Sequence, residues 1–147
     1  HIMKSDPSRK FCLASEDCCA SIRPENRGCY RAQAYQTARR MAHKLALPEG
    51  QWSVAFQSRL GRTPWIKPYT DYRLPELVKG GCKNIVVICA AFVADCLETL
   101  EEIGMRAKED WIEDGGESLT LVPAVNASPR WLTAASDLVR RAAPDVH

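Results

Sequence analysis

The run from Asn84 to Glu102, NIVVICAAFVADCLETLEE, constrains the fold of this chain more than any other segment. It begins with a continuous block of β-branched residues, which is typical of a strand covered on both faces, as in a parallel sheet flanked by helices. Asp95 then opens a helix, and Glu98 three residues later completes the pattern of a capping box. The run therefore predicts a buried strand whose carboxyl end leads into a helix with acids in its first turns.

These acids have a structural and a functional interpretation. The helix dipole favours acidic residues in any first turn, so capping alone explains Asp95 and Glu98. Glu102, however, lies one turn beyond Glu98 on the same helical face, whereas Glu101 lies on a neighbouring face and is expected to be only solvated. Ligands of open α/β sheets bind outside the carboxyl ends of the strands, where this helix begins. The spacing thus indicates carboxylates at the mouth of a cleft.

The rest of the chain alternates strands with helices, which predicts a parallel α/β sandwich. The expected strands, three in number, cover residues 52–57, 85–89 and 118–125. The expected helices cover residues 30–45, 74–79, 106–113 and a closing stretch from Pro129 onward, capped by Ser128. In that last helix, an apolar stripe is expected to face inward: Leu132, Ala135, Leu138 and Val139.

Length and composition fit one domain. The chain has 147 residues, 46% of them hydrophobic, which suffices for a single core of ordinary size. Its net charge of +2 gives no nucleic-acid footprint. No apolar stretch approaches the ~20 residues that span a bilayer, and the polar N-terminus carries no secretory signal. We therefore expect a cytoplasmic protein, with a peripheral membrane contact left open.

The seven cysteines divide into a loop group and a packing group. Without a secretory signal, thiols are expected to be reduced, buried or metal-bound. Four of them lie in one loop with few apolar residues, at positions Cys12, Cys18, Cys19 and Cys29. Four thiolates so close together suit an iron–sulfur cluster or tetrahedral zinc, although the adjacent pair fits a zinc ribbon poorly. A cluster is favoured over zinc and over unmetallated thiols, and the remaining cysteines are expected to pack in the core.

Two segments resemble the ferrochelatases, a family of enzymes that insert ferrous iron into a porphyrin. FVADCLETLEE, residues 92–102, is similar to the active-site segment of that family. FQSRLGRTPWIKPYTD, residues 56–71, resembles its characteristic segment, and weaker similarity runs from Cys29 to Val139. The resemblance implies the C-terminal lobe of a two-lobed α/β enzyme that converts protoporphyrin IX to protohaem. It divides the chain into a cysteine-rich loop over 1–29 and a chelatase-like three-layer lobe over 30–147.

The resemblance also implies roles for the acids. Glu98 matches the catalytic glutamate of the family, so it is expected to accept pyrrole protons and to meet the ferrous ion, with Asp95 and Glu102 in support. A glutamate buried beside other acids would have a raised pKa. Two positions depart from the family's pattern. Arg106 stands where related enzymes continue the acidic line, and Cys96 stands where many carry histidine.

Further residues are implied in the porphyrin pocket and in the cluster site. Trp65 and Phe92 match pocket positions, the alternatives being that Trp65 anchors its loop and that Phe92 packs beneath the helix. Ser58 and Arg59 are expected at the cleft, with Arg59 as partner of a propionate. Some bacterial members hold a 2Fe-2S cluster at the place of the cysteine loop, with a similar order of single, paired and single cysteines.

The family's lobe has four strands, and the fourth is expected just upstream of residue 1, beside the family's catalytic histidine. In a flavodoxin-like order that strand is central. We therefore expect the isolated chain to be unstable, to aggregate, or to be completed by the N-terminal lobe or by a second copy. Two other functions stay open, namely a non-catalytic iron–sulfur or haem-binding module, and a small single-domain chelatase that acts on another tetrapyrrole.

Overall fold

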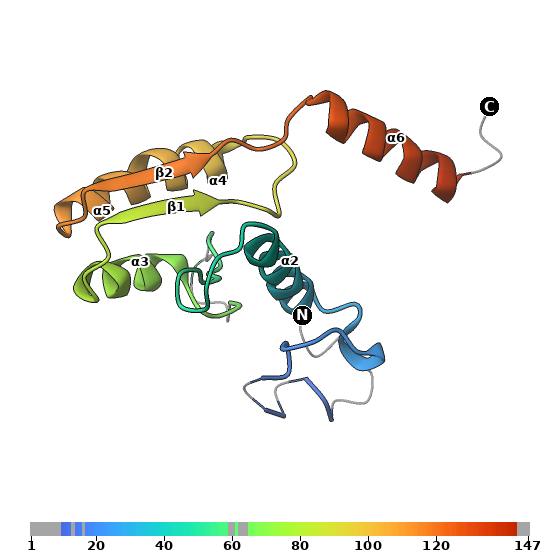
Figure 1. Cartoon of the computed structure of the whole chain (residues 1–147), viewed down its shortest axis with the longest axis horizontal. Coiled ribbons are helices and arrows are strands. Elements are labelled where there is room, and N and C mark those ends of the chain that lie inside the picture. Colours follow the sequence, from blue (N-terminus) through green and yellow to red (C-terminus); the bar gives the residue numbers. More distant parts are fainter. Residues whose placement is uncertain (1–9, 13, 16, 59–60, 62–64, 144–147) are drawn as a thin grey trace. The chain divides into compact units, whose positions relative to one another are not determined.

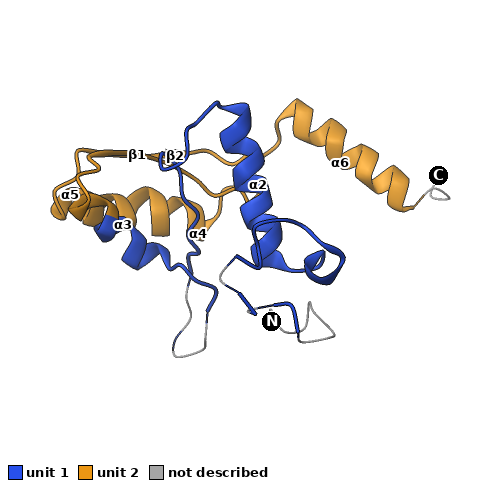
Figure 2. Ribbon diagram, turned by 60° about the horizontal axis from the view of Figure 1, so that its bottom comes forward, with its two compact units in different colours: residues 1–76 blue, residues 77–147 orange. Residues whose placement is uncertain are grey.

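The computed structural model describes residues 10–143 except 13, 16, 59–60 and 62–64 (Figure 1). The chain divides into two compact units, residues 1–76 and 77–147, and each is considered by itself (Figure 2). Within the described residues, every helix is too short or too polar to cross a bilayer.

Unit 1 contains the long helix α2, Tyr30–Lys44, where a helix was predicted. Ala32 and Ala42 are buried on α2, and a single 3-10 turn, η1 (Pro24–Asn26), precedes it. Asn26 closes the cysteine loop, because its side-chain amide donates to the carbonyl oxygens of Cys18 (2.9 Å) and Ser21 (2.8 Å). Asn26 is itself only 1% exposed, so these hydrogen bonds are made away from water.

The strand predicted over residues 52–57 is wrong. Phe56 makes only an isolated parallel bridge with Tyr69. The N–H of Phe56 donates to the carbonyl of Pro68 (2.8 Å), and the carbonyl of Phe56 accepts from the N–H of Thr70 (3.1 Å). Both backbone groups of Phe56 are therefore paired with residues 68–70. A strand pairs with a neighbouring strand over several residues, but residues 52–57 pair with another segment only at Phe56. The Phe56 side chain is buried instead, as part of the core of unit 1, with its ring centroid 6.1 Å from that of Tyr30.

Unit 2 holds a parallel sheet of two strands, β1 (Asn84–Ile88) and β2 (Ser118–Val122), where two of the three strands were predicted (Figure 1). Their register runs from Asn84 opposite Ser118 to Ile88 opposite Val122. The continuous apolar sequence of β1 predicted that both faces of the strand are buried. Within unit 2 this prediction is wrong. Val86 remains 69% exposed, because one face of the strand has no layer packed on it.

One helical run connects the two strands. It consists of α4 (Leu97–Leu100), the π-helix η2 (Glu102–Ala107) and α5 (Lys108–Glu113), and its last two parts lie along β2 (Figure 1). The sequence predicted two separate helices here. They join because the N–H of Arg106 donates to the carbonyl of Glu101 (2.9 Å), the wider hydrogen bond of a π turn.

The core of unit 2 lies between this helical run and β2. Ile103, Trp111 and Leu119 are each at most 3% exposed. Gly104 allows the close approach, since a Cβ there would lie 3.2 Å from the Cδ2 of Leu121. The helical run is therefore held against β2 along most of its length.

The boundary between the two units lies within α3 (Thr70–Lys79), after Glu76, and α6 (Pro129–Ala142) is the last helix of unit 2. Helix α3 begins four residues earlier than predicted. Helix α6 begins after Ser128, as predicted, but the expected inward stripe is wrong. Leu138 and Val139 are 59% and 65% exposed, and no residue of α6 is buried. An apolar stripe is buried only where another element packs on it.

Candidate active site

The acids predicted as catalytic all come from one short stretch after β1. Asp95 lies in the loop, Glu98 in α4 and Glu102 at the start of η2. The predicted capping box is displaced by one residue, because Cys96 and not Asp95 is the N-cap of α4. The N–H of Cys96 donates to Oγ1 of Thr99 (3.0 Å) in the reciprocal half of that box.

The carboxylate of Asp95 accepts hydrogen bonds from other groups instead. It accepts from Nδ2 of Asn126 (2.8 Å), from the N–H of Ala124 (3.1 Å) and from Oγ1 of Thr99 (3.2 Å). Hydrogen bonds to the ionised form lower a carboxyl pKa. The pKa of Asp95 accordingly lies below its ordinary value, first through Asn126, then through Ala124 and Thr99. Asp95 is thus an ionised anchor between the loop after β1 and the loop after β2.

Sequence reasoning missed Asn126. Its side chain pairs with both the carboxylate and the backbone N–H of Asp95, and its φ of +46° lies in the left-handed region. Asn tolerates this conformation better than most residues, so the VNASP turn after β2 carried a usable signal. The Asp95 contact itself carried no such signal, because the two residues are far apart in the sequence.

Glu98 is exposed in this structure, and its pKa is lowered, so the expected raised pKa is wrong here. A hydrogen bond from the Cys96 side chain is the main cause, and one from the backbone N–H of Glu98 itself is the second. The expectation assumed a buried carboxylate, and burial is what raises such a pKa. At neutral pH Glu98 is therefore ionised.

The acids create a negative potential at the carboxyl end of β1. Cys89, which directly follows β1, has a thiol pKa raised to about 11. Burial is the largest cause, and the nearby Cys96, Glu102 and Asp95 add to it. The same potential would attract a metal cation.

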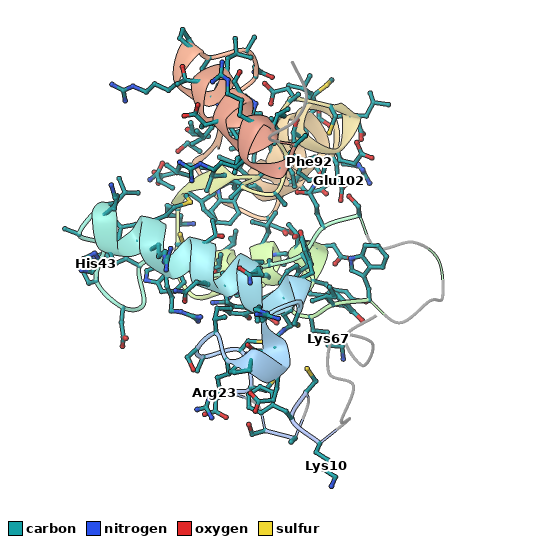
Figure 3. The ribbon with its side chains drawn as sticks, turned by 90° about the vertical axis from the view of Figure 1, so that its right-hand side faces the viewer. Lys10, Arg23, His43, Lys67, Phe92 and Glu102 are labelled. Carbon is teal, nitrogen blue, oxygen red and sulfur yellow. The ribbon has the colours of Figure 1, made fainter. Side chains whose placement is uncertain are left out.

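Phe92 and Arg106 flank this stretch. Phe92 is half-buried, its N–H donates to the carbonyl of Cys89 (2.9 Å), and it projects from the loop before α4 (Figure 3). Arg106 binds the Glu101 carboxylate through two nitrogens, both at 3.2 Å. Glu101, expected to be only solvated, is an exposed ion-pair partner. The five-residue spacing of the pair follows the π turn.

The other predicted pocket residues belong to unit 1. Nε1 of Trp65 donates to the carbonyl of Gln57 (2.9 Å) while the side chain stays 38% exposed, so Trp65 anchors its loop and still presents ring surface. Ser58 is half-buried with a left-handed φ of +59°. Arg59 lies outside the described residues.

The cysteine loop forms a small buried core in unit 1. Cys18, Cys19 and Cys29 are 7%, 6% and 1% exposed, and they cluster with Ala32. The sulfurs of Cys18 and Cys19 lie 3.8 Å apart, and Cys12 is half-buried. The pKa of Cys19 is raised mainly by burial.

Among the described residues, no three His, Cys, Asp or Glu side chains are arranged to hold a metal. The chemical type of these cysteine side chains nevertheless suits an iron–sulfur cluster. They provide soft donors, and three of the four share one buried neighbourhood. The Arg31 side chain donates a hydrogen bond to Cys19, which would favour a thiolate form. The donor set is therefore suitable in type, while its described arrangement is that of packed thiols.

The fold and the acids define an α/β protein with carboxylates at the carboxyl end of a parallel sheet, where such proteins bind their ligands. The family model described as Ferrochelatase matches residues 14–143, and the chain belongs to the ferrochelatase family. The resemblance found in its two segments is thus confirmed.

Curated relatives agree with this assignment. The ferrochelatases of Pseudomonas fluorescens strains Pf0-1 and SBW25 are 53% and 52% identical over 143 residues. The ferrochelatase of Ectopseudomonas mendocina (strain ymp) is 52% identical over the same length. Each match covers 97% of this chain and 42% of the relative. The chain therefore spans less than half the length of these proteins.

Proposed function

We propose that this chain supplies the carboxylate-bearing part of an enzyme that inserts ferrous iron into protoporphyrin IX to form protohaem. Membership of the ferrochelatase family over residues 14–143 is the observation that carries the proposal. The grouping of Asp95, Glu98 and Glu102 after β1 supports it. Because the chain spans 42% of its relatives, the partner required for turnover is the remaining part of such an enzyme.

In this proposal Glu98 is the acid/base residue. Insertion replaces the pyrrole N–H protons by a ferrous ion, so a base must accept protons while the metal exchanges water for ring nitrogens. The Glu98 carboxylate is ionised and exposed, so a proton or a cation can reach it from the solvent. A porphyrin that covers Glu98 would exclude water and raise its pKa, which would make it a better base.

The neighbouring acids have supporting roles. Asp95 is occupied by three donors, so it orients the turn from which Glu98 projects. Glu102 is half-buried and contributes to the negative potential that raises the pKa of Cys89. A ferrous ion approaching Glu98 would be attracted by that potential.

Aromatic and polar residues are proposed to contact the porphyrin. The exposed ring surface of Trp65 suits an apolar macrocycle, and ring contacts of this kind contribute about 0.5–1.5 kcal/mol beyond burial. Phe92 would add a second ring. Ser58 and Arg59 are proposed at the edge, where a guanidinium binds a propionate through two hydrogen bonds.

A 2Fe-2S cluster on Cys12, Cys18, Cys19 and Cys29 belongs to the same proposal. The group would cross-link the loop and supply a one-electron redox centre. Anaerobically purified protein should contain iron and sulfide, both lost in Cys29→Ser. Zinc in their place would favour a tetrahedral zinc site. A bound cluster together with no iron insertion by the complete enzyme would favour a non-catalytic iron–sulfur module.

A cytoplasmic location is also proposed. Whether the complete enzyme forms a homodimer or touches a membrane surface is decided by sedimentation of the purified protein with and without lipid vesicles.

The decisive experiment joins this chain to the part of the Pseudomonas fluorescens Pf0-1 relative that it does not match, which we propose is the N-terminal part. Anaerobic loss of protoporphyrin fluorescence on addition of ferrous iron measures insertion. Glu98→Gln should abolish it, whereas Glu113→Gln, an exposed acid at the end of α5, should retain it. Equal activity in the two variants would overturn the assignment of Glu98.

A further inference from the structure

We propose that Asn126 is a positioning residue, which holds the turn before α4, and with it the Glu98 carboxylate, in a fixed place against the loop after β2. The inference rests on the proposed function, because the position of Glu98 matters only where Glu98 meets a substrate. It gives a residue far from the acids in the sequence a defined part in their arrangement.

Asn126 binds the turn at three points. Its Oδ1 accepts the N–H of Asp95 (2.9 Å), and its Nδ2 donates to Oδ2 of the same residue (2.8 Å). Its own N–H donates to the carbonyl of Val93 (2.9 Å). One residue of the loop after β2 therefore fixes the backbone on both sides of Ala94. Such a two-way pair needs a side chain that both donates and accepts, which an amide does and a carboxylate does not.

The contact continues from Asp95 into α4. Oδ1 of Asp95 accepts from Oγ1 of Thr99, which is 1% exposed and directly follows Glu98. Helix α4 is the amino-terminal end of the helical run, and Thr99 fixes this end to Asp95. The hydrogen bonds that start at Asn126 therefore act on the part of the run that carries Glu98.

Asn84 provides a matched control at the opposite end of the same strands. Its Nδ2 donates to Oε2 of Glu117 (3.1 Å), and its Oδ1 accepts from Oγ of Ser118 (2.6 Å). Asn84 thus joins the amino ends of β1 and β2 as Asn126 joins the loops after their carboxyl ends. Removal of either amide removes comparable hydrogen bonds, but only Asn126 contacts the turn that carries the acids.

The test uses this chain joined to the N-terminal part of the Pf0-1 relative, with glycine at position 126 or 84. Glycine accepts the left-handed backbone at position 126, so Asn126→Gly removes the amide without adding strain. Asn126→Gly should lower kcat for iron insertion by about tenfold or more and leave the KM for protoporphyrin nearly unchanged. Asn84→Gly should keep kcat within about twofold. Thermal melting of both variants shows that they are folded.

An exchange of the two side chains separates positioning from direct chemistry. Asn126→Asp alone places two carboxylates together, and Asp95→Asn alone places two amides together. In the double variant Asp95→Asn with Asn126→Asp, an amide again faces a carboxylate, and the new Asp still accepts the N–H of residue 95. The double variant should therefore recover most of the kcat that each single change loses.

The outcomes distinguish the two proposals. No iron insertion by the unsubstituted fusion would overturn the proposed function and this inference with it. An active fusion in which Asn126→Gly behaves like Asn84→Gly would overturn the inference alone. A double variant no better than the single variants would also overturn it, because Asp95 would then act through its own carboxylate.

Discussion

The backbone of Gly116 lies directly against the indole ring of Trp111, so closely that a Cβ at position 116 would overlap the ring. Trp111 is 1% exposed, and its Nε1 donates to the carbonyl of Lys83 (3.3 Å) just before β1. The Gly116 contact therefore fixes the end of α5 against the start of the sheet. A larger residue has no space there unless Trp111 moves.

Gly116→Ala should destabilise the chain, because overpacking of a filled core typically costs about 1–3 kcal/mol. The urea midpoint of unfolding measures the loss. Gly28→Ala is the matched control, since a Cβ at position 28 meets nothing within 4 Å. That control should be neutral or slightly stabilising. A Gly116→Ala midpoint equal to that of Gly28→Ala would show that the indole shifts freely.

Asn126→Gly should raise the pKa of Asp95, because Asn126 is the largest cause of its lowering. Carbon-detected NMR of the carboxyl group follows the titration. A carboxyl pKa that is lower in the folded than in the unfolded state stabilises the fold above the ordinary value near 3.8, and this stability is lost as the pH falls through the lowered pKa. The stability difference between the parent and Asn126→Gly should therefore shrink on acidification. An unchanged Asp95 titration would contradict the observed pair.

Cys89 should react slowly with alkylating reagents until the pH approaches about 11, because only the thiolate is nucleophilic. Mass spectrometry of the peptide that contains Cys89 measures the rate. Glu102→Gln should lower this pKa, since it removes a charge that disfavours the thiolate. Glu109→Gln, further along the same helical run and not among the causes of the shift, is the control. Rapid alkylation at about pH 8 would contradict the environment found for this thiol.

Asn26→Ala should loosen the cysteine loop and cost about 1–3 kcal/mol, because it leaves the buried carbonyl of Cys18 and the partly buried carbonyl of Ser21 without this donor. Proteolysis of the loop, or the unfolding midpoint, detects the change. Gln33→Ala is the control, since its amide donates to Arg27 from an exposed position. A loop equally resistant in both variants would mean that the cysteine core holds without Asn26.

The elements that carry the acids were predictable from local patterns. The IVVI run predicted β1, and a helix with acids in its first turns was expected after it, where α4 and η2 lie. The N-cap of α4 was predicted one residue too early. Asp is a favoured N-cap residue, but the carboxylate of Asp95 accepts a hydrogen bond from Asn126 instead. The direction of the Glu98 pKa shift was also predicted wrongly, because the spacing of the acids does not show whether their side chains are buried or exposed.

The sequence by itself determined α2, β1, β2 and the start of α6, because periodicity and capping act over a few neighbouring residues. Only the tertiary structure decided that residues 52–57 form a single bridge and that Asp95 pairs with Asn126. Those outcomes depend on which distant backbone and side-chain groups are within hydrogen-bonding reach. A linear pattern contains no such distances, and so the anchor of the acidic turn became visible only in the folded chain.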